Sequence, residues 1–468
     1  MFVPKSESTF VPDTSFAPPR VTPPAAPLPF LRAIITLLDN PIEAWPQAVY
    51  EQRFWEPRSL GVPGWRYLYV LDPDAIRDVL LEKQGGFSKG DVFRRMLRPA
   101  LGDAILTAEG AHWRWQRQAA ARAFRHERLL SMTPSMTRAA EATLARWRVG
   151  APDAYRDIAH DMVRATFDVI LETMLSGGEG LNIDQASREI GVYLETLGQP
   201  SVTDLFGLPA WLRVASNPRG ARALRYLKRA VGNVVKRRRA TGANRGDLVD
   251  MLLQAVDPET ARQMSDEDLR DNIITFISAG HETTALALTW ALYLISNHRP
   301  TEERLLAEIA AVAGDASIAP EHIERLTFTK QVVQEAMRLF PPVAILPRAV
   351  EVDTVIADVR VKAGTTLLIP IYALHRHRTL WEDPDNFDPD RFRAENASTR
   401  HRFAYLPFGG GPRICIGMSF AMIEATAMLA TFVRGARFVH HPTHQIRPLV
   451  RITMRPQGGM PMLVTARE

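Results

Sequence analysis

The segment FGGGPRICIG, residues 408–417, contains the only cysteine of the chain, Cys415. A single cysteine forms no disulfide within its chain, which leaves packing, metal ligation or nucleophilic attack. The neighbouring glycines cost chain entropy unless something requires the backbone to lie close, as a flat ligand pressed against the loop would. A predicted helix from Met418 onward would turn its positive end toward the thiol and favour the thiolate. Because the motif has no histidine base, we favour an axial metal ligand over a nucleophile, with a buried core thiol as the alternative.

A second group of polar residues, SAGHETT at 278–284, lies inside a long apolar segment. Glu282 and Thr283 put an acid and a hydroxyl where packing alone would favour leucine. Gly280 costs a helix about 0.5–1 kcal/mol relative to alanine. A small residue, an acid and a hydroxyl in a buried groove suit the binding of a diatomic ligand and proton transfer to it. The alternative is a polar turn that faces solvent.

Three further polar patterns indicate less. Glu335 and Arg338 are spaced i, i+3 on a predicted helix, and most such pairs are exposed and worth a few tenths of a kcal/mol. The basic run 236–239 precedes Thr241-Gly242, so we interpret it as the cationic last turn of a helix rather than a nucleic-acid patch. The histidine-rich segment 440–444 is interpreted as a polar loop rather than a metal site.

Composition limits the class of protein. The chain has 468 residues, 46% of them hydrophobic, which is enough to bury a large core, and its formal charge of +5 is too small to indicate nucleic acid. One cysteine suits a reducing cytoplasm. No apolar run approaches the ~20 residues that span a bilayer. These features predict a soluble cytoplasmic protein with no membrane span.

The elements that would position these residues are mainly helical. Eight prolines in the first thirty residues predict an extended leader over 1–40, and residues 41–468 are expected to form one large domain with small β-sheets. Strands are predicted after about residue 350, with Gly458-Gly459 as the turn of a terminal hairpin. Apolar spacing predicts helices over the following segments: 112–132, 161–175, 268–297 and 330–340.

Together these segments resemble the cytochrome P-450 family of haem-thiolate monooxygenases, in the family's order from about residue 45 to the end. FGGGPRICIG resembles its cysteine-ligand loop. AGHETT resembles its oxygen-activation groove, with Glu282 where many bacterial members have aspartate. EAMR, with Glu335 and Arg338, resembles the family's Glu–Arg pair, whose third member would be Arg391 in PDRF. The resemblance implies a single helical domain of this type, with haem b between the long central helix and the cysteine loop.

The resemblance also implies roles for individual residues. Cys415 would ligate the haem iron, and Thr283 and Glu282 would hold bound O2 and bring protons to it. Glu335, Arg338 and Arg391 would be structural and brace the cysteine loop. Contacts to the haem are implied for Trp113, Arg117, Ala279, Arg348, Phe408, Gly409, Arg413 and Gly417.

The implied substrate pocket is apolar, so a hydrophobic substrate is expected: a fatty acid, a terpenoid, a steroid-like or an aromatic compound. Loops near 91–107 and 198–212 should complete the pocket. No flavin or nicotinamide domain accompanies the haem domain, so electrons should come from a separate ferredoxin or flavodoxin with its reductase, docking at the basic surface on the cysteine side. The pocket residues implied are Phe276, Ala279, Val343, Ile345 and Leu346.

The residues of the chain disfavour three other functions. A peroxygenase would take hydrogen peroxide directly, but such relatives typically lack the acid–threonine pair formed here by Glu282 and Thr283. A non-catalytic gas-binding haem protein would need neither a proton relay nor a thiolate that promotes O–O cleavage. A hydrolase with Cys415 as nucleophile lacks a base in the motif.

Overall fold

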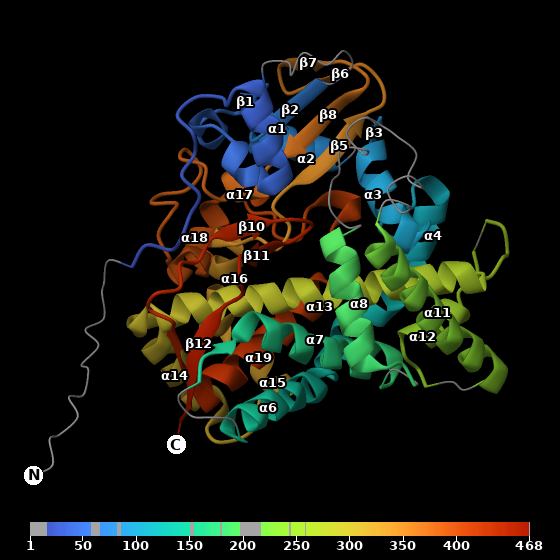
Figure 1. Ribbon diagram of the computed structural model, residues 1–468, viewed down its shortest axis with the longest axis vertical. Coiled ribbons are helices and arrows are strands. Elements are labelled where there is room, and N and C mark those ends of the chain that lie inside the picture. The colour runs from blue at the N-terminus through green and yellow to red at the C-terminus, as the bar shows by residue number, and fades with distance from the viewer. Residues whose placement is uncertain are drawn as a thin grey trace, which may run out of the picture.

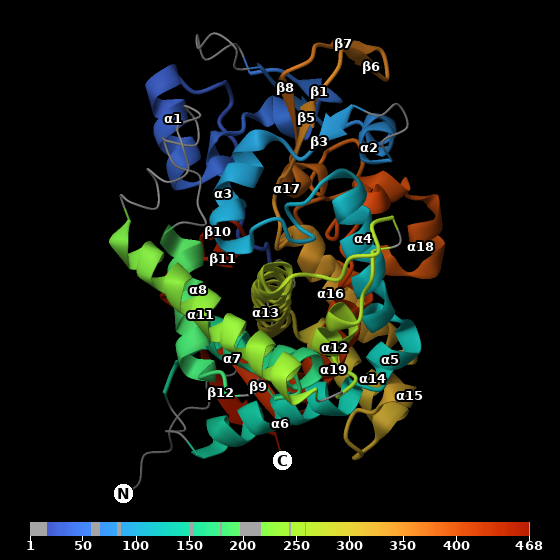
Figure 2. The same cartoon turned by 90° about the vertical axis from the view of Figure 1, so that its right-hand side faces the viewer.

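A long central helix, α13 (Asp266–Ser296), organises the fold. The structure is a computed structural model, and residues 16–57, 66–81, 86–149, 154–177, 180–196, 217–242, 245–257 and 259–467 are described. Helix α13 crosses the whole molecule in Figure 1 and is seen end-on at its centre in Figure 2. It packs against α7, α11, α16 and α19, so most of the core forms around it.

The α-helices of the described residues, including α13, have the following bounds: α1 (Phe30–Asp39), α2 (Pro73–Leu80), α3 (Asp91–Leu101), α4 (Gly110–Ala121), α5 (His126–Leu130), α6 (Thr133–Val149), α7 (Ile158–Leu175), α8 (Ile183–Thr196), α11 (Pro218–Thr241), α12 (Leu248–Leu253), α14 (Arg299–Ala313), α15 (Pro320–Ile323), α16 (Thr327–Leu339), α17 (Ile371–Leu374), α18 (Ala394–Thr399) and α19 (Met418–Gly435). Short 3-10 helices are η1 (Pro41–Ala44), η2 (Gln47–Tyr50), η3 (Arg122–Phe124), η4 (Pro389–Phe392), η5 (Arg402–Ala404) and η6 (Gly411–Arg413).

The strands lie at the two ends of the chain and form small sheets: β1 (Phe54–Trp55), β2 (Arg66–Val70), β3 (Phe87–Ser88), β4 (Arg156–Asp157), β5 (Leu346–Val350), β6 (Thr354–Ile356), β7 (Val359–Val361), β8 (Thr365–Ile369), β9 (Ala436–His440), β10 (Pro448–Val450), β11 (Met454–Pro456) and β12 (Pro461–Ala466). The largest sheet has the order β1-β2-β8-β5-β3 and stands above the helices in Figure 1. The mainly helical fold with small sheets is therefore confirmed.

Helix α13 forms where the apolar pattern predicts it. Its N-terminus is fixed by a capping box in which Ser265 Oγ accepts from the Asp268 N–H at 3.1 Å and Asp268 Oδ2 accepts from the Ser265 N–H at 3.1 Å. From Leu269 to Ile295 its buried residues lie on every side, which is how a helix through the middle of a core is packed. The polar group 278–284 therefore lies inside the protein rather than on a solvent-facing turn.

The five-stranded sheet places one wall of the functional site. Strand β5 pairs antiparallel with β8, with Leu346 opposite Ile369 and Arg348 opposite Leu367. In β8 the side chains alternate, so that Leu367 and Ile369 are fully buried under α2 while Leu368 turns to the other face. The sheet thus covers its own small core and leaves the opposite face for the cavity described below.

Three expectations need correction, and a fourth is not tested. The helix predicted over 112–132 is divided at Arg122–Arg125 into α4, η3 and α5. The hairpin at Gly458-Gly459 is wrong, because β11 pairs with β10 whereas β12 pairs with β9 and β4. The extended leader over 1–40 is wrong for its last ten residues, which form α1; residues 1–15 lie outside the described part, and the domain boundary stays a prediction. The pocket loop expected near 198–212 also lies outside the described residues.

The basic run 236–239 ends α11 as predicted, since Gly242 takes the left-handed conformation with φ 60°. The third residue of this run, Arg238, also has a role inside the protein. Arg238 is fully buried, and its guanidinium pairs with Asp247 at 2.8 Å and Asp250 at 2.6 Å. Within the described residues, no helix is long and apolar enough to cross a bilayer.

Candidate functional site

A cavity of about 1580 Å³ lies between α13, the cysteine loop, α4 and the β5–β8 face of the large sheet. It collects residues that are far apart in the sequence, and most of its lining is apolar. Glu335, Arg338 and Arg391 are absent from the described lining and lie behind it. The predicted site residues that line the cavity are Trp113, Arg117, Phe276, Ala279, Glu282, Thr283, Val343, Ile345, Leu346, Arg348, Phe408, Gly409, Arg413, Cys415 and Gly417.

The cysteine loop forms one wall of this cavity. The Cys415 N–H donates to the Phe408 carbonyl at 2.9 Å, which closes the loop on itself, and α19 begins three residues later. Gly411 has φ 69°, and a Cβ there would lie 1.9 Å from the Leu80 carbonyl oxygen of α2. Packing against backbone therefore explains Gly411, whereas at Gly417 the nearest atoms to a Cβ are at an ordinary 3.8 Å. Gly417 is the position where the protein itself leaves room beside the thiol.

The Cys415 side chain is exposed, but to the cavity rather than to the outside of the molecule. Burial accordingly raises the pKa of this thiol above its ordinary value of 9.0, while a hydrogen bond from the Gly417 N–H and the charge of Arg117 act in the opposite direction. The backbone donor expected at the start of the helix does favour the thiolate, but burial outweighs it. A bound metal ion would supply the missing stabilisation, because coordination deprotonates a thiol.

A cluster of four cations borders the cavity beside the cysteine loop: Lys89, Arg117, Arg348 and Arg413. Arg413 donates to the Ala108 carbonyl at 2.9 Å, pairs with Glu109 and stacks over Trp113 at 3.8 Å. Glu109 is the carboxylate that pairs within this cluster, so positive charge is in excess.

Lys89 is the member of the cluster that no sequence pattern indicates. Its Nζ donates to the Leu106 carbonyl and its N–H donates to Glu109 Oε1 at 3.2 Å. Burial, together with the charges of Arg413, Arg348 and Arg117, lowers the pKa of Lys89 to about 7. Such a cluster would be relieved by a ligand that carries carboxylates.

On α13, the acid and hydroxyl predicted from SAGHETT both line the cavity. Thr283 Oγ1 donates to the Ala279 carbonyl at 2.8 Å. Glu282 is not a free acid, because its Oε1 accepts from Arg455 Nη2 at 2.8 Å and from Thr453 Oγ1 at 3.0 Å. Arg455 and Thr453 come from the C-terminal region of the chain, and local sequence gives no sign of this contact.

Packing against α7 explains why residue 280 of the same helix is a glycine. A Cβ at this position would lie 2.7 Å from Ile170 Cδ1 of α7. The neighbouring turn of α7 supplies Thr166, whose hydroxyl lies 2.7 Å from the His281 carbonyl oxygen. Helix α7 therefore fits tightly behind the polar part of α13 and fixes its position.

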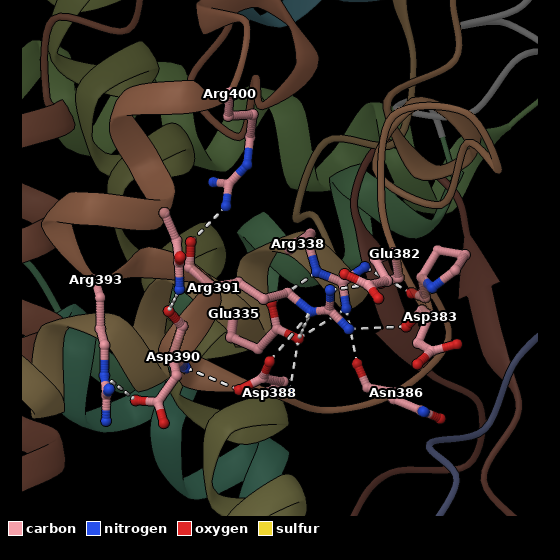
Figure 3. A network of polar contacts seen from close by, with 12 residues as sticks. Glu335, Arg338, Glu382, Asp383, Asn386, Asp388, Asp390, Arg391, Arg393 and Arg400 are labelled. Atoms are coloured by element: carbon pink, nitrogen blue, oxygen red, sulfur yellow. Dashed lines mark hydrogen bonds and ion pairs between the residues drawn. The ribbon is translucent and has the colours of Figure 1, made fainter.

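The predicted Glu–Arg pair is buried and fully bonded (Figure 3). Arg338 makes two parallel bonds to Glu335, at 2.6 and 2.7 Å, and neither side chain is exposed. Arg391 joins them, with its Nε 3.6 Å from Glu335 Oε1. The remaining Arg338 donors reach the carbonyl oxygens of Pro384, Asn386 and His375.

His375 connects this network to the cysteine loop. Its carbonyl accepts from Arg338 at 2.9 Å, and its Nε2 accepts from the Leu406 N–H at 2.8 Å. Burial and the charge of Arg338 lower the pKa of His375 well below 6.5, so the ring is neutral and can accept. This residue was missed, because a lone histidine in a sequence does not disclose which loop it bonds.

Glu424 on α19 is a buried acid behind the site. It is fully buried, no basic side chain of the described residues pairs with it, and burial raises its pKa well above 4.5, opposed in part by the hydroxyl of Thr284. Burial therefore favours the protonated form of this carboxyl over the ionised one.

Comparisons with known proteins agree with this arrangement. A family model described as Cytochrome P450 matches residues 50–461. The chain is 33% identical to cyclooctatin synthase of Streptomyces melanosporofaciens, over 82% of this chain and 83% of that protein. It is 31% identical to pentalenene oxygenase of Streptomyces avermitilis, over 84% of this chain and 87% of that protein. The solved haem domain of cytochrome P450DA superposes with a TM-score of 0.77 at 25% identity, covering 89% of this chain and 90% of that one.

The fold and the comparisons define an oxidoreductase that uses haem. The chain belongs to the cytochrome P450 family, and it is a P450 monooxygenase. The donor set suits a haem: a thiol opens on an apolar cavity, and cations in excess of carboxylates stand at one edge, where a flat apolar ligand with two carboxylates would be held. No described residue that lines the cavity is a histidine, so the hydrolase alternative lacks its base.

Proposed function

We propose that this monooxygenase inserts one oxygen atom from O2 into a terpenoid. The observation that carries the proposal is that Cys415 and the Glu282–Thr283 pair open on one apolar cavity of about 1580 Å³. An apolar lining favours a hydrocarbon skeleton over a polar substrate. The relatives named for cyclooctatin and pentalenene support a substrate of this class.

The cofactor proposed is haem b, held by Cys415 as the axial ligand. Arg117, Arg348, Arg413 and Lys89 would hold its propionates, and Trp113 would add its indole N–H. Bound in this way, a thiolate-ligated haem supplies the activation of O2. The remaining haem contacts are proposed as the resemblance implies them, from Ala279, Phe408, Gly409 and Gly417.

The residues of the chain would then position the substrate and move protons. Phe276, Val343, Ile345 and Leu346 would hold the substrate and exclude water. Thr283 Oγ1 keeps its proton against the Ala279 carbonyl and can accept a second hydrogen bond. Glu282 would replace the proton that Thr283 gives up.

Electrons are proposed to come from a separate ferredoxin or flavodoxin with its reductase, and a cytoplasmic location remains a prediction. The acid–hydroxyl pair on the cavity wall disfavours the peroxygenase and the gas-binding alternatives. Full turnover with hydrogen peroxide and no reductase would reverse this preference.

The first test is the absorption spectrum of the dithionite-reduced protein with and without carbon monoxide. We expect the strongly red-shifted Soret band of a thiolate-ligated haem, and we expect Cys415→Ser to lose it. An unshifted band in the unaltered protein would refute ligation by Cys415, and the absence of any haem band would refute the proposal as a whole.

The substrate class is tested separately by titration of the oxidised protein. Cyclic terpenes are expected to displace water from the site and change the spin state, whereas a short polar alcohol should not. An equal response to straight-chain fatty acids, with none to terpenes, would contradict the terpenoid assignment.

A further inference from the structure

Glu282 uses its two carboxylate oxygens differently. Oε1 accepts both bonds already described, from Arg455 and from Thr453. Oε2 is buried and has no hydrogen-bond partner among the described residues. A buried carboxylate normally has all its lone pairs satisfied, so the unpartnered oxygen of a residue that lines the cavity is a candidate to exchange a proton.

Arg455 is held in place from several sides. It lies on β11, where it stands opposite Leu449 of β10. The neighbouring Met454 donates its N–H to the Pro342 carbonyl at 2.9 Å and accepts at its own carbonyl from the indole of Trp290 at 3.4 Å. The guanidinium of Arg455 therefore reaches Glu282 from a backbone that these hydrogen bonds hold in place.

Strands β10 and β11 form the hairpin that carries Arg455, and this hairpin is hydrogen-bonded to a segment near the N-terminus. Asn40 donates to the Pro448 carbonyl at 3.0 Å and accepts from the Val450 N–H at 3.1 Å. Arg447 makes two bonds to Glu43, both at 2.7 Å. The contact between Arg455 and Glu282 thus depends on segments from three regions of the chain.

Arg455 also extends toward the surface. Its Nη1 lies 3.9 Å from Glu195 of α8, whose side chain is 57% exposed, whereas the Glu282 side chain is only 10% exposed. The guanidinium therefore stands between a buried acid and an acid in contact with solvent. An arginine cannot release its own proton at physiological pH, so its effect on the two acids is electrostatic.

The other titratable groups near Glu282 do not replace this cation. His281 is buried against Phe167, and burial lowers its pKa, so the ring is neutral at pH 7. Glu424, which faces Thr284 from α19, is an acid whose pKa burial raises, and it supplies no positive charge. Glu195 is an acid as well and pairs with the same arginine.

We propose that Arg455 is a positioning residue for oxygen activation: with Thr453 it holds Oε1 of Glu282, supplies the positive charge that pairs with this carboxylate, and leaves Oε2 to take up a proton and pass it to Thr283. This inference rests on the proposed function, since it fixes the geometry of Glu282 for that reaction. In the proton transfer, Oε2 takes one proton from water, which leaves as hydroxide, and gives it to the Thr283 oxygen as that oxygen gives up its own proton, so both side chains end as they began and no electrons move.

The electrostatic part of the proposal is tested without turnover. Removal of Arg455 leaves a buried carboxylate unpaired, and such a group takes up a proton instead. The infrared difference between the haem-loaded Arg455→Leu protein and the unaltered protein should therefore show an additional protonated carboxyl band at neutral pH, in which the contribution of Glu424 cancels. This band should be absent from the difference between the Arg455→Leu/Glu282→Gln double variant and the unaltered protein. An Arg455→Leu spectrum equal to that of the double variant would overturn the proposal.

The functional part is tested by the fraction of supplied electrons that appears in product. Arg455→Leu should lower coupled product formation by about 10- to 100-fold, as loss of a partner that orients a reacting group commonly does. It should also change the pH profile, and Arg455→Lys should restore part of the activity. Arg455→Leu should have no further effect once Glu282 is Gln; additive losses would mean that Arg455 acts elsewhere.

A matched control comes from the C-terminal region. Arg467→Ala also removes the ion pair of a partly buried arginine, but that pair involves Glu302 of α14 and no described part of the cavity lining. If Arg467→Ala and Arg455→Leu gave the same coupling and pH profile, the effect would be structural and the proposal would be wrong. The spectrum with carbon monoxide distinguishes failure of this inference from failure of the proposed function. A thiolate-type Soret band in every variant would support the proposed function even if Arg455 proved dispensable.

Discussion

The Leu406 N–H donates to Nε2 of His375 at 2.8 Å, two residues before the segment that carries Cys415 begins. The carbonyl of the same histidine accepts from Arg338. His375 is therefore the link through which the Glu335–Arg338 pair fixes the start of the cysteine loop.

Substitution of His375 tests this link. His375→Phe keeps the ring volume but leaves the Leu406 N–H unsatisfied, which costs about 1–3 kcal/mol. We expect faster haem loss on transfer to a haem acceptor. Because the pKa of His375 is lowered, its contribution is present above the ordinary value of 6.5 and is lost as the pH falls through the lowered value. His126→Phe, at an exposed position, is the control, and an equal rate of haem loss in both variants would argue against the link.

Loss of one partner of the Glu335–Arg338 pair is predicted to lower the free energy of unfolding more than loss of both partners. Arg338→Met leaves Glu335 as a buried, unpaired charge and should lower the free energy of unfolding by about 3–5 kcal/mol. The double variant Arg338→Met/Glu335→Leu should be less unstable than Arg338→Met. Urea unfolding measures both.

An exposed ion pair serves as the control for this experiment. Arg299→Ala breaks an i, i+4 contact with Glu303 on the surface and should change the free energy of unfolding by no more than about 1 kcal/mol. A double variant that is less stable than Arg338→Met would show that burial of the pair is not the dominant cost.

The protonation state of Lys89 should change when the haem carboxylates bind. Its pKa of about 7 makes it largely neutral at pH 8, and two propionates beside it would favour the charged form. On haem binding to the haem-free protein at pH 8, Lys89 should therefore take up about one proton, which offsets the proton that Cys415 releases on coordination; calorimetry in buffers of different ionisation enthalpy measures the net exchange. Lys89→Met should shift this net exchange by about one proton toward release, and Lys330→Met, at an exposed position, should not. An unchanged net exchange in Lys89→Met would disprove the assignment.

Glu424 is predicted to destabilise the protein at neutral pH. Its raised pKa means that the unfolded chain releases this proton before the folded one does, so stability falls by about 1.4 kcal/mol per pH unit above the ordinary value of 4.5. Glu424→Gln should be more stable than the unaltered protein at pH 7, and the two should converge below about pH 4.5. Glu303→Gln, which is exposed, should show no such convergence, and a Glu424→Gln curve parallel to that of the unaltered protein would contradict the prediction.

The parts of the site that could be predicted from sequence are those encoded within one segment. The Cys415 loop, the acid and hydroxyl of α13 and the i, i+3 spacing of Glu335 and Arg338 each lie within a few consecutive residues, where glycine and helix periodicity are informative. The cysteine loop and the acid–hydroxyl pair line one cavity, the Glu335–Arg338 pair lies behind it, and the roles of all three remain proposals.

What could not be predicted depends on contacts between distant segments. Arg455 reaches Glu282 across 173 positions, and Lys89 joins a cluster whose other members come from three elements. Arg238 looks like an exposed cation in a basic run because the aspartates that bury it follow the helix. The Gly458-Gly459 turn was misjudged since two glycines permit a sharp turn without determining which strand is paired after it.

The bonds between Asn40 and the β10 strand join positions 408 and 410 residues apart. On the ribosome, where a chain is made from its N-terminus, residues 40–43 are synthesised long before the hairpin that binds them. Helix α13 likewise emerges with Glu282 before Arg455 exists. The wall of the cavity can therefore close only after residues 448–455 have been synthesised, and this late segment determines when the site becomes complete.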